Sequence, residues 1–393
     1  MDYTKWNTIK LKYAYHFSIG FTPNTSNLSY YENGVYSWAQ ISDLNSKVFS
    51  TTQKKITLQA ITDYQPTLAP KNSLLVSFLL SPGVTSFCGI DTYFNQAIAC
   101  FPPTNKNSLN YLYYILPIAI RNLSRVNIYG APIYTSGILK NLLIPLPPID
   151  TQKTVSSFLD RKYSLIQELI QKNQSSIDYL KQYKISLIYD LYFKNNILLK
   201  YLPLKYFVLV MKSGSTPPKG KNYYNGNIPW VTTSDLNDSL IINTMKKVTL
   251  QAIYDCHLPL FPKNCLILGI YGSLLLNLGI LSMEATINQS CCGLICNPNL
   301  LSMKYLYYFF LYFRSSTYLS FYAKGVTYKR LDLIVLKSLK IPVIPLMDQS
   351  SIVTYLDQKC SLIDLLVQKL TLFIHKLKEY QQSLLYETFQ NLS

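Results

Sequence analysis

The chain has 393 residues, of which 49% are hydrophobic and 14% aromatic, so it can bury more than one core and is not disordered. The formal charge of +17 predicts an anionic partner, either nucleic acid or an acidic membrane surface. The 8 cysteines form no Cys-x-x-Cys pair and only 3 histidines are present, which argues against a metal site and predicts a reduced, cytoplasmic protein.

Residues 1–143 predict one strand-rich α/β domain. Turn signals separate short apolar runs, from a G-x-T-P turn at 20–23 to an N-Q pair at 95–96. The aromatic run YLYY at 111–114 predicts a helix near the end of the domain. The first residues contain no continuous apolar core of the kind that a signal peptide needs, so we do not expect secretion.

Residues 144–196 predict a rigid proline turn followed by one long helix. The turn is I-P-L-P-P, and after Pro148 no proline or glycine occurs before Pro203, so a helix can continue without a break. Forty-odd residues at about 1.5 Å rise would make a rod of roughly 60 to 65 Å.

Residues 197–340 repeat the motifs of the first domain in the same order and predict a second α/β domain. G-S-T-P at 214–217 matches 20–23, N-Q at 288–289 matches 95–96, and YLYY at 305–308 matches 111–114. The matched tryptophans, each followed by S-D-L-N, are Trp38 and Trp230. We expect both tryptophans in the core.

Residues 265–283 carry no charged side chain and are about as long as a membrane helix, which needs roughly 20 apolar residues. The corresponding residues 73–90 of the first half are interrupted by S-P-G at 81–83, as a strand, turn and strand would be. We therefore predict a buried β-hairpin in both halves.

Residues 341–393 repeat the proline turn and the long helix, 197 positions after the first copy and without a gap over 341–387. Two heptad-spaced series predict that the helices pair as an antiparallel coiled coil within the chain, related by a pseudo-two-fold axis; a bundle or core helix is the alternative. Asn173, a polar residue in the first series, would set the register or, alternatively, mark a frayed or partner-facing position. The first series is Leu159, Ile166, Asn173, Leu180 and Leu187, with Leu356, Ile363, Leu370, Leu377 and Leu384; the second is Val155, Lys162, Leu169, Ser176 and Tyr183, with Ile352, Lys359, Leu366, Phe373 and Tyr380.

Catalytic motifs are missing from the sequence. Asn297-Pro298-Asn299 is the nearest approach to the N-P-P-Y loop of an adenine methyltransferase, and no second proline or aromatic residue follows it. Residues 214–221 do not fit a phosphate-binding loop, because one residue too many separates the glycines. The histidines lie far apart in the sequence, at positions 16, 257 and 375.

The order of these motifs, their duplication and the two long helices resemble the specificity subunit of type I restriction-modification systems. The resemblance covers essentially the whole chain, and the second half is the closer match because Ser37 stands where the second half has Pro229 before its tryptophan. It implies an α/β (α+β) fold with target recognition domains at 1–143 and 197–340. Each domain would read one half of a bipartite double-stranded DNA target, and the helices at 144–196 and 341–393 would set the spacing and dock two methyltransferase subunits.

The resemblance also implies that the chain itself is a non-catalytic DNA-binding subunit without a cofactor or metal. S-adenosylmethionine, ATP and Mg²⁺ would act in the methyltransferase subunits and in any restriction or translocase subunit. Two alternatives stay open: a stand-alone DNA methyltransferase or nuclease, and a membrane-associated coiled-coil scaffold that the positive charge would favour.

Candidate DNA contacts divide into lysines for phosphates and hydroxyls or rings for base edges. Solvated charges and strand packing are the respective alternatives. A basic run at 328–330 has no charged counterpart at 129–137, which predicts that the halves read different bases. The candidates are Thr22, Tyr30, Tyr31, Ser42, Lys54, Lys55, Thr216, Lys219, Lys221, Tyr223, Tyr224, Thr233, Ser234, Lys246, Lys247, Tyr328, Lys329 and Arg330. The candidates for docking the partner subunits lie off the predicted seams: Gln167, Glu168, Gln171, Lys172, Gln368 and Lys369.

Overall fold

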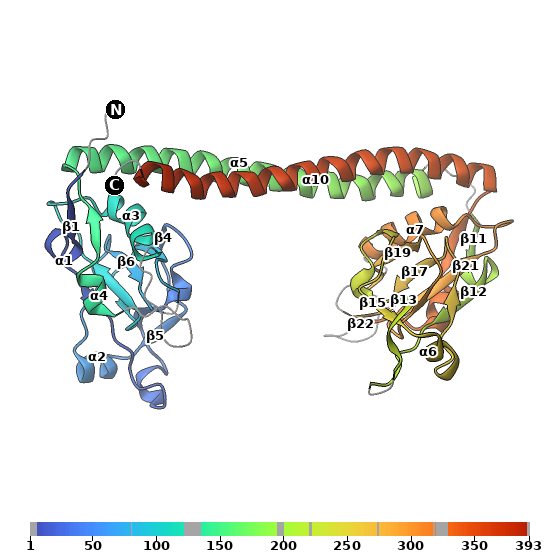
Figure 1. The fold of residues 1–393 in the computed structure, drawn as a ribbon, viewed down its shortest axis with the longest axis horizontal. Coiled ribbons are helices and arrows are strands. Elements are labelled where there is room, and N and C mark those ends of the chain that lie inside the picture. The colour runs from blue at the N-terminus through green and yellow to red at the C-terminus, as the bar shows by residue number, and fades with distance from the viewer. Residues whose placement is uncertain are drawn as a thin grey trace. The chain divides into compact units, whose positions relative to one another are not determined.

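A computed structural model describes residues 6–79, 81–121, 135–194, 200–219, 222–272, 275–316, 319 and 329–390. The chain divides into two compact units, Met1–Lys172 with Phe373–Ser393 and Asn173–Leu372. Each unit contains one α/β domain together with one end of each of two long helices, α5 (Ile149–Tyr189) and α10 (Leu346–Gln390) (Figure 1).

The domain of the first unit has short strands and four α-helices in its described part. Its elements are β1 (Thr8–Lys10), α1 (Leu11–Ala14), β2 (Ser18–Ile19), β3 (Tyr36–Ala39), β4 (Val48–Phe49), β5 (Lys54–Ile56), α2 (Leu58–Tyr64), β6 (Leu74–Ser77), β7 (Thr85–Cys88), β8 (Tyr93–Phe94), β9 (Ile98–Phe101), α3 (Leu109–Arg121), α4 (Ser136–Lys140) and β10 (Leu143–Pro145). They form a five-stranded sheet in the order β2-β9-β6-β7-β4 and a three-stranded sheet in the order β5-β3-β8.

The domain of the second unit repeats this plan. Its elements are β11 (Lys200–Pro203), β12 (Val208–Ser213), β13 (Tyr224–Val231), β14 (Ser239–Ile241), β15 (Lys246–Val248), α6 (Leu250–Asp255), β16 (Leu260–Phe261), β17 (Leu266–Gly269), β18 (Tyr271–Gly272), β19 (Leu278–Leu281), β20 (Ala285–Ile287), β21 (Cys291–Cys296), α7 (Met303–Ser315), β22 (Lys329–Arg330), α9 (Leu333–Ser338) and β23 (Lys340–Val343). The sheet orders are β12-β21-β17-β19-β14 and β15-β13-β20-β16, so the strands of these two sheets correspond to those of the first unit, with β16 added. Strands β18 and β22 form a further two-stranded pair.

The long charge-free segment of the second half forms part of this sheet. Strands β17 and β19 pair antiparallel, with Leu266 opposite Ile280, and β6 and β7 pair in the same way in the first unit. The predicted hairpins are therefore confirmed. Among the described residues, no helix combines the length and hydropathy that crossing a membrane requires.

The chain enters and leaves each domain at one place. Strand β1 pairs antiparallel with β10, and β11 pairs antiparallel with β23, so the residues before the domain lie beside the proline turn that follows it. Both long helices begin within a few residues of these strand pairs. Figure 1 shows β1 below the start of α5.

Each domain core extends into the long helices. In the first unit, Leu159 of α5 and Phe389 of α10 belong to the same buried cluster as α3. In the second unit, Ile188 and Tyr192 lie with Leu356 of α10 and the residues of α7 in one buried cluster. Shared burial of this kind makes a hinge between domain and helix costly to open.

The long helices pair antiparallel in both units. In the first unit the Tyr163 hydroxyl donates to the Gln381 carbonyl oxygen over 3.0 Å, and in the second unit Lys184 forms an ion pair with Asp364 over 2.7 Å. Residues near the start of α5 thus meet residues near the end of α10, and the reverse holds in the other unit. This confirms the predicted antiparallel arrangement.

The predicted seam was only half right. The first heptad series is buried or half-buried throughout. In the second series, the first residue of each helix and Lys162 are buried or half-buried, and all the other residues are exposed. Burial instead follows the residues one position later, namely Tyr163, Ile170, Ile177 and Lys184, with Cys360, Val367, Ile374 and Gln381. Apolar side chains occupy both series, so heptad spacing alone could not decide which one faces the other helix.

The exposed series and its neighbours form what we call the outer stripe. It comprises Phe158, Leu165, Leu169, Tyr179 and Tyr183 on α5, and Tyr355, Leu362, Leu366, Phe373 and Tyr380 on α10, all at least 42% exposed. The Lys162 ammonium lies 5.8 Å from the Phe158 ring centre, and Lys359 lies 5.7 Å from that of Tyr355. The same kind of surface therefore occurs on both helices.

Candidate nucleic-acid interface

The G-x-T-P turn is built in the same way in both domains. A side chain at Gly20 would place its Cβ 2.2 Å from the Phe94 carbonyl oxygen, and one at Gly214 would lie 1.8 Å from that of Ile287. Only glycine allows this close approach of two backbones. The turn therefore lies directly against the strand that precedes the N-Q pair in each domain.

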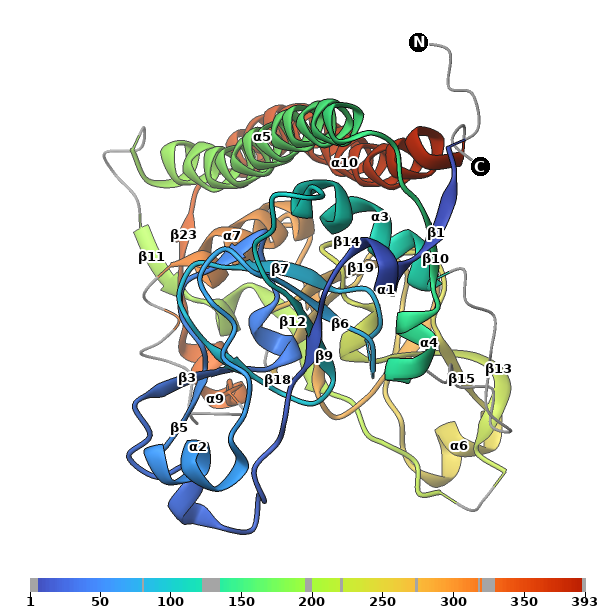
Figure 2. The same cartoon turned by 90° about the vertical axis from the view of Figure 1, so that its left-hand side faces the viewer.

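In each domain a buried tryptophan donates a hydrogen bond to the backbone of this turn. The indole N–H of Trp38 donates to the Phe21 carbonyl oxygen over 3.1 Å, and that of Trp230 donates to Ser215 over 3.3 Å. Both tryptophans are buried, as we predicted. Figures 1 and 2 show that this end of each domain, beyond β5 or β15, lies away from the long helices.

The hydroxyl groups of all four candidate tyrosines donate hydrogen bonds within their own domain, and two of them donate to the G-x-T-P turns. Tyr31 donates to the Pro23 carbonyl oxygen over 2.6 Å, and Tyr224 donates to that of Pro217. The other two bond to carboxylates, Tyr30 to Asp63 and Tyr223 to Asp255, each over 3.0 Å. The hydrogen bond to Asp63 raises the pKa of Tyr30. These contacts favour the packing interpretation, and a role of the four rings at base edges stays a prediction.

A buried or half-buried aspartate joins the S-D-L turn to the strand that carries two lysines. Asp43 accepts from the backbone N–H groups of Gln40 (2.8 Å) and Gln53 (3.0 Å), and Asp235 accepts from those of Thr232 (2.8 Å) and Met245 (3.0 Å). The aspartate therefore has a structural role. The serines before it, Ser42 and Ser234, are exposed, and Thr233 is half-buried.

The paired lysines lie on edge strands with their side chains exposed. Lys54 and Lys55 belong to β5, and Lys246 and Lys247 belong to β15. Among the described residues each strand is hydrogen-bonded on one side only, to β3 or β13. Lys219 is also exposed, in the turn before β13. Exposed cations on a sheet edge suit phosphate contacts and also discourage edge-to-edge pairing.

The N-Q pair, which recurs in both halves of the sequence, adds a residue to the candidate contacts in each domain. The Asn95 side-chain oxygen accepts from the Ala97 N–H over 3.0 Å, and that of Asn288 accepts from Ser290 over 3.1 Å. This turn leaves Gln96 and Gln289 exposed beside the G-x-T-P turn. A glutamine amide can donate and accept at once, which suits reading an adenine edge. The recurrence of the N-Q pair in both halves is the sequence signal that points to these two glutamines.

The second domain also has a pocket of about 450 Å³ with both polar and apolar lining residues. Strand β22 pairs with β18 and brings Arg330, whose side chain is 64% exposed, opposite Tyr271. Ser213, at the end of β12, and Gln289 also line the pocket. Arginine, glutamine, serine and tyrosine side chains together provide the donors and acceptors used in groove readout.

Several candidates cannot be placed. Lys221 and Tyr328 lie outside the described residues, as does most of the segment at 129–137 that corresponds to the basic run. Lys329 is placed as part of β22. Thr22 is half-buried and Thr216 is exposed, at the third position of their turns.

The candidate docking residues are all exposed on the long helices. Glu168 and Lys172 form an ion pair over 2.7 Å, which lowers the pKa of Glu168. Gln167 lies 3.4 Å from the side-chain oxygen of Gln381, so it is at the rim of the helix pair. Lys172 and Lys369 fall between residues of the outer stripe.

No group of three or more metal-binding side chains occurs within the part of the chain that the structure describes. The eight cysteines are reduced, and seven of them are buried. Burial raises the pKa of Cys265 and Cys292 to about 12 and that of Cys360 to about 11, so the thiolate is rare at neutral pH. Cys256 is the only one that is partly exposed.

The family model of the type I restriction modification DNA specificity domain matches residues 3–179 and 204–372, and the chain belongs to this family. The MjaIX specificity subunit of Methanocaldococcus jannaschii is 32% identical over 155 residues, which cover 38% of this chain and 35% of that protein. The EcoR124I/EcoR124II specificity subunit of Escherichia coli is 30% identical over 182 residues, covering 44% and 45%. The matches thus span less than half the length of these relatives.

Solved structures share the two-domain fold. The chain superposes with a TM-score of 0.75 on a chain from a study of complex assembly and conformational transition of the type I R-M system, at 16% identity over 98% of this chain and 97% of that one. The HsdS subunit from Thermoanaerobacter tengcongensis gives a TM-score of 0.57 at 16% identity, over 99% and 97%. The fold predicted from the duplicated motifs is confirmed.

Proposed function

We propose that this chain is the DNA-recognition subunit of a type I restriction-modification complex and reads a bipartite target, one half with each α/β domain. The observation that carries the proposal is the duplication of a supported loop cluster, in which the G-x-T-P, S-D-L and N-Q turns recur with the same hydrogen bonds. Two recognition domains related by a pseudo-two-fold axis would match the pseudo-two-fold symmetry of duplex DNA. The unread spacer would lie between the half-sites.

The two domains differ where bases would be read. Gln96 and Gln289 occupy matched turns and would make the same kind of base contact in both domains, whereas Arg330 lines a pocket in the second domain. An arginine can bond the O6 and N7 atoms of guanine together. We therefore expect different sequences in the two half-sites, with Arg330 reading a base in the second.

The outer stripe would dock the modification subunits. Exposed apolar side chains with flanking lysines recur on α5 and α10 at the same offset as the sequence repeat, so one kind of partner fits both surfaces. Two methyltransferase subunits per chain follow from two surfaces. Lys172 and Lys369, with Gln167, Glu168, Gln171 and Gln368 nearby, would contribute polar contacts at the rim.

In this proposal the chain is not catalytic by itself. S-adenosylmethionine would bind to the methyltransferase subunits, and ATP and Mg²⁺ to a restriction or translocase subunit where one is present. The purified chain, incubated with DNA and either Mg²⁺ or a methyl donor, should neither cleave nor methylate. Activity of the chain alone would support a stand-alone enzyme instead.

Methylome sequencing of the host with and without the gene tests the central claim. We expect one split adenine-methylation motif to disappear on deletion. A contiguous motif, or an unchanged methylome, would contradict the proposal.

Docking is tested with Leu165→Glu and Leu362→Glu, alone and together, in the chain co-expressed with the methyltransferase subunits. Each single change should remove one methyltransferase subunit, and the pair should remove both, because a buried carboxylate at an interface is costly. Gln174→Glu, at an exposed position on the opposite side of α5 from Leu165, is the matched control. If charge reversals at Glu168 and Lys172 alone prevent assembly, the polar rim and not the stripe is the docking surface.

A further inference from the structure

A buried glutamine lies at the junction of each domain with its long helix. Gln152 in α5 and Gln349 in α10 are 1% and 0% exposed. They stand at the same position of the repeat, one turn after the proline segment. A buried side-chain amide is costly unless its hydrogen bonds are satisfied, so its partners show what it holds together.

Gln152 connects three segments in the first unit. Its side-chain oxygen accepts from the Ser108 N–H, at the start of α3, over 2.8 Å. Its amide nitrogen donates to the side-chain oxygen of Asn107 over 3.0 Å and to the Pro147 carbonyl oxygen over 2.8 Å. One side chain thus ties the N-terminus of the domain helix to the proline turn and to α5.

Gln349 makes the matching contacts in the second unit. Its oxygen accepts from the N–H of Ser302, the N-cap of α7, over 2.8 Å. Its nitrogen donates to the carbonyl oxygens of Ile344, over 2.8 Å, and Leu300, over 3.0 Å. Ile344 corresponds to Pro147 in the repeat, so the same backbone position is held in both halves.

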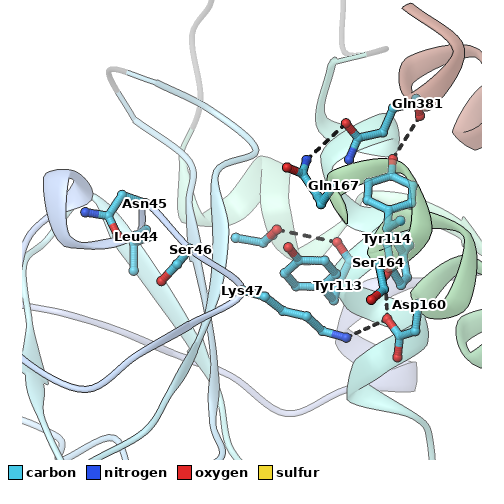
Figure 3. A pocket seen from close by; sticks show the side chains of 12 residues that line it. Leu44, Asn45, Ser46, Lys47, Tyr113, Tyr114, Asp160, Ser164, Gln167 and Gln381 are labelled. Carbon is cyan, nitrogen blue, oxygen red and sulfur yellow. Dashed lines mark hydrogen bonds and ion pairs between the residues drawn. The ribbon is translucent and has the colours of Figure 1, made fainter. Parts of the chain in front are cut away.

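A second attachment point lies farther along each long helix. The Tyr114 hydroxyl donates to the Asp160 carboxylate, and that of Tyr308 donates to Asp357 over 2.8 Å. Figure 3 shows that Lys47 also reaches the Asp160 carboxylate. Each aspartate follows its glutamine by eight residues, which places the two points about 12 Å apart along the helix.

A third bond joins the domain helix to the strand that leads into the long helix. The Tyr111 hydroxyl donates to the Pro145 carbonyl oxygen over 2.9 Å, and that of Tyr305 donates to Pro342 over 3.4 Å. One attachment would let the domain helix pivot on the long helix. Attachments at separated points, made through directional hydrogen bonds, fix the angle between them.

We propose that Gln152 and Gln349, with the Tyr114–Asp160 and Tyr308–Asp357 hydrogen bonds, are positioning residues that fix the direction in which each domain faces the DNA and thereby the spacer length that the chain accepts. The inference rests on the proposed bipartite function. One base pair more or less in the spacer turns one half-site by about 34 to 36° relative to the other. A rigidly held domain cannot follow that rotation, whereas a loosened one can.

The experiment uses the full chain co-expressed with its methyltransferase subunits, after methylome sequencing has defined the split motif. Plasmids carry this motif with the native spacer or with one or two base pairs added or removed, and the methylated fraction of each is measured. The variants are Gln152→Met and Gln349→Met, which keep the side-chain length and remove the hydrogen bonds. Tyr114→Phe and Tyr308→Phe are milder variants for the case that a methionine variant fails to fold.

We expect the preference for the native spacer over a spacer changed by one base pair to fall by about tenfold in each variant, which is about 1.4 kcal/mol of relative binding free energy. Leu75→Ala is the control, because Leu75 is fully buried in the sheet core of the first domain and its loss destabilises without touching the junction. Unchanged spacer preference in the glutamine and tyrosine variants, or the same loss in Leu75→Ala, overturns the inference. A wild-type chain without a split motif would overturn the proposed function instead.

Discussion

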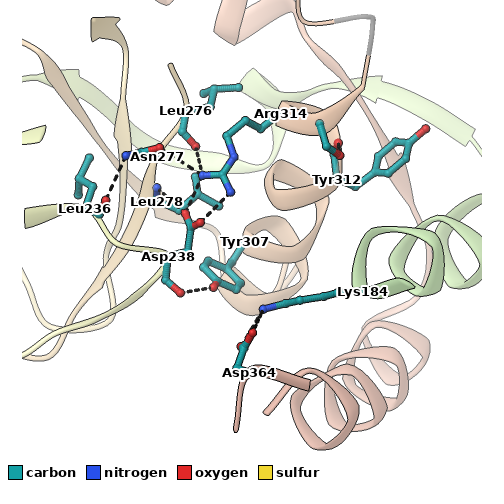
Figure 4. Close-up of polar contacts among 11 residues, drawn as sticks. Lys184, Leu236, Asp238, Leu276, Asn277, Leu278, Tyr307, Tyr312, Arg314 and Asp364 are labelled. Atoms are coloured by element: carbon teal, nitrogen blue, oxygen red, sulfur yellow. Dashed lines mark hydrogen bonds and ion pairs between the residues drawn. The ribbon is translucent and has the colours of Figure 1, made fainter. Parts of the chain in front are cut away.

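The two junctions between domain and helix agree in their buried contacts and differ in their exposed ion pairs. The Asp160 carboxylate pairs with Lys47, which comes from the loop after the S-D-L turn, whereas the Asp357 carboxylate pairs with Lys304 of α7. In the second unit the loop after S-D-L is held by another pair, because Arg314 bonds to both oxygens of Asp238 over 2.7 and 2.8 Å (Figure 4).

The difference shows which contacts the repeated architecture requires. Backbone-directed bonds from Gln152 and Gln349 recur because they satisfy buried groups that the fold itself creates. Exposed ion pairs stabilise only weakly, so their positions can change between the copies without loss of the fold. The helix pair follows the same rule: Lys184 faces Asp364 in one unit, and the equivalent residues Gln381 and Gln167 face each other in the other.

The largest effect is expected from Leu159→Ala and Leu356→Ala. Both side chains are fully buried where a long helix enters a domain core, so each change should lower the free energy of unfolding by about 2 to 5 kcal/mol through lost contacts and a residual cavity. Differential scanning calorimetry measures the loss for each unit. Equal losses would confirm that the two cores are equivalent. A clearly smaller loss at one position would show that the long helix contributes less to the stability of that core.

Replacing the lysine pairs should weaken DNA binding and its dependence on salt. If both lysines of a pair contact phosphates, Lys54→Ala with Lys55→Ala, or Lys246→Ala with Lys247→Ala, should reduce the slope of log K against log salt by about 1.8. Fluorescence anisotropy over a range of NaCl concentrations measures the slope. An unchanged slope would show that the lysines do not contact phosphates. A change in one domain only would show that the two domains contact the DNA backbone differently.

Arg314→Met should cost more than Lys47→Met. The bidentate pair of Arg314 with Asp238 is partly shielded, with side chains 27% and 32% exposed, and we expect a loss of about 1 kcal/mol. The Lys47 pair is more open and should contribute only a few tenths of a kcal/mol. Urea denaturation of the two variants shows which loss of unfolding free energy is larger. A larger loss for Lys47→Met would show that the first junction depends on its ion pair.

The smallest effect is expected at the rim of the helix pair. Asp364→Asn leaves Lys184 without its charged partner and should cost about 0.5 kcal/mol, a loss that decreases with added salt. Gln167→Asn, at the equivalent position of the other unit, should cost less and show no salt dependence, because no charge is removed. Thermal unfolding at low and high NaCl compares the two.

Sequence reasoning found most of the fold and only part of the candidate site. The repeat located both domains' motifs and both helices, and the S-P-G interruption at 81–83 identified residues 265–283 as a hairpin. The sequence could not show which side chains of a motif pack within the domain and which are exposed for contact with DNA. Tyr31 and Tyr224 point their hydroxyls at the turn prolines, and the exposed Gln96 and Gln289 were left out, because orientation within a turn depends on contacts with distant residues.

The sequence by itself determined what recurs: apolar periodicity, proline turns and the order of motifs are local properties that survive duplication. Only the tertiary structure decided which heptad series faces the other helix, leaving Leu169 and Leu366 on the outside. It alone also brought Gln152 to Ser108 and Gln349 to Ser302, since hydrogen bonds between residues more than forty positions apart follow from packing and not from local pattern.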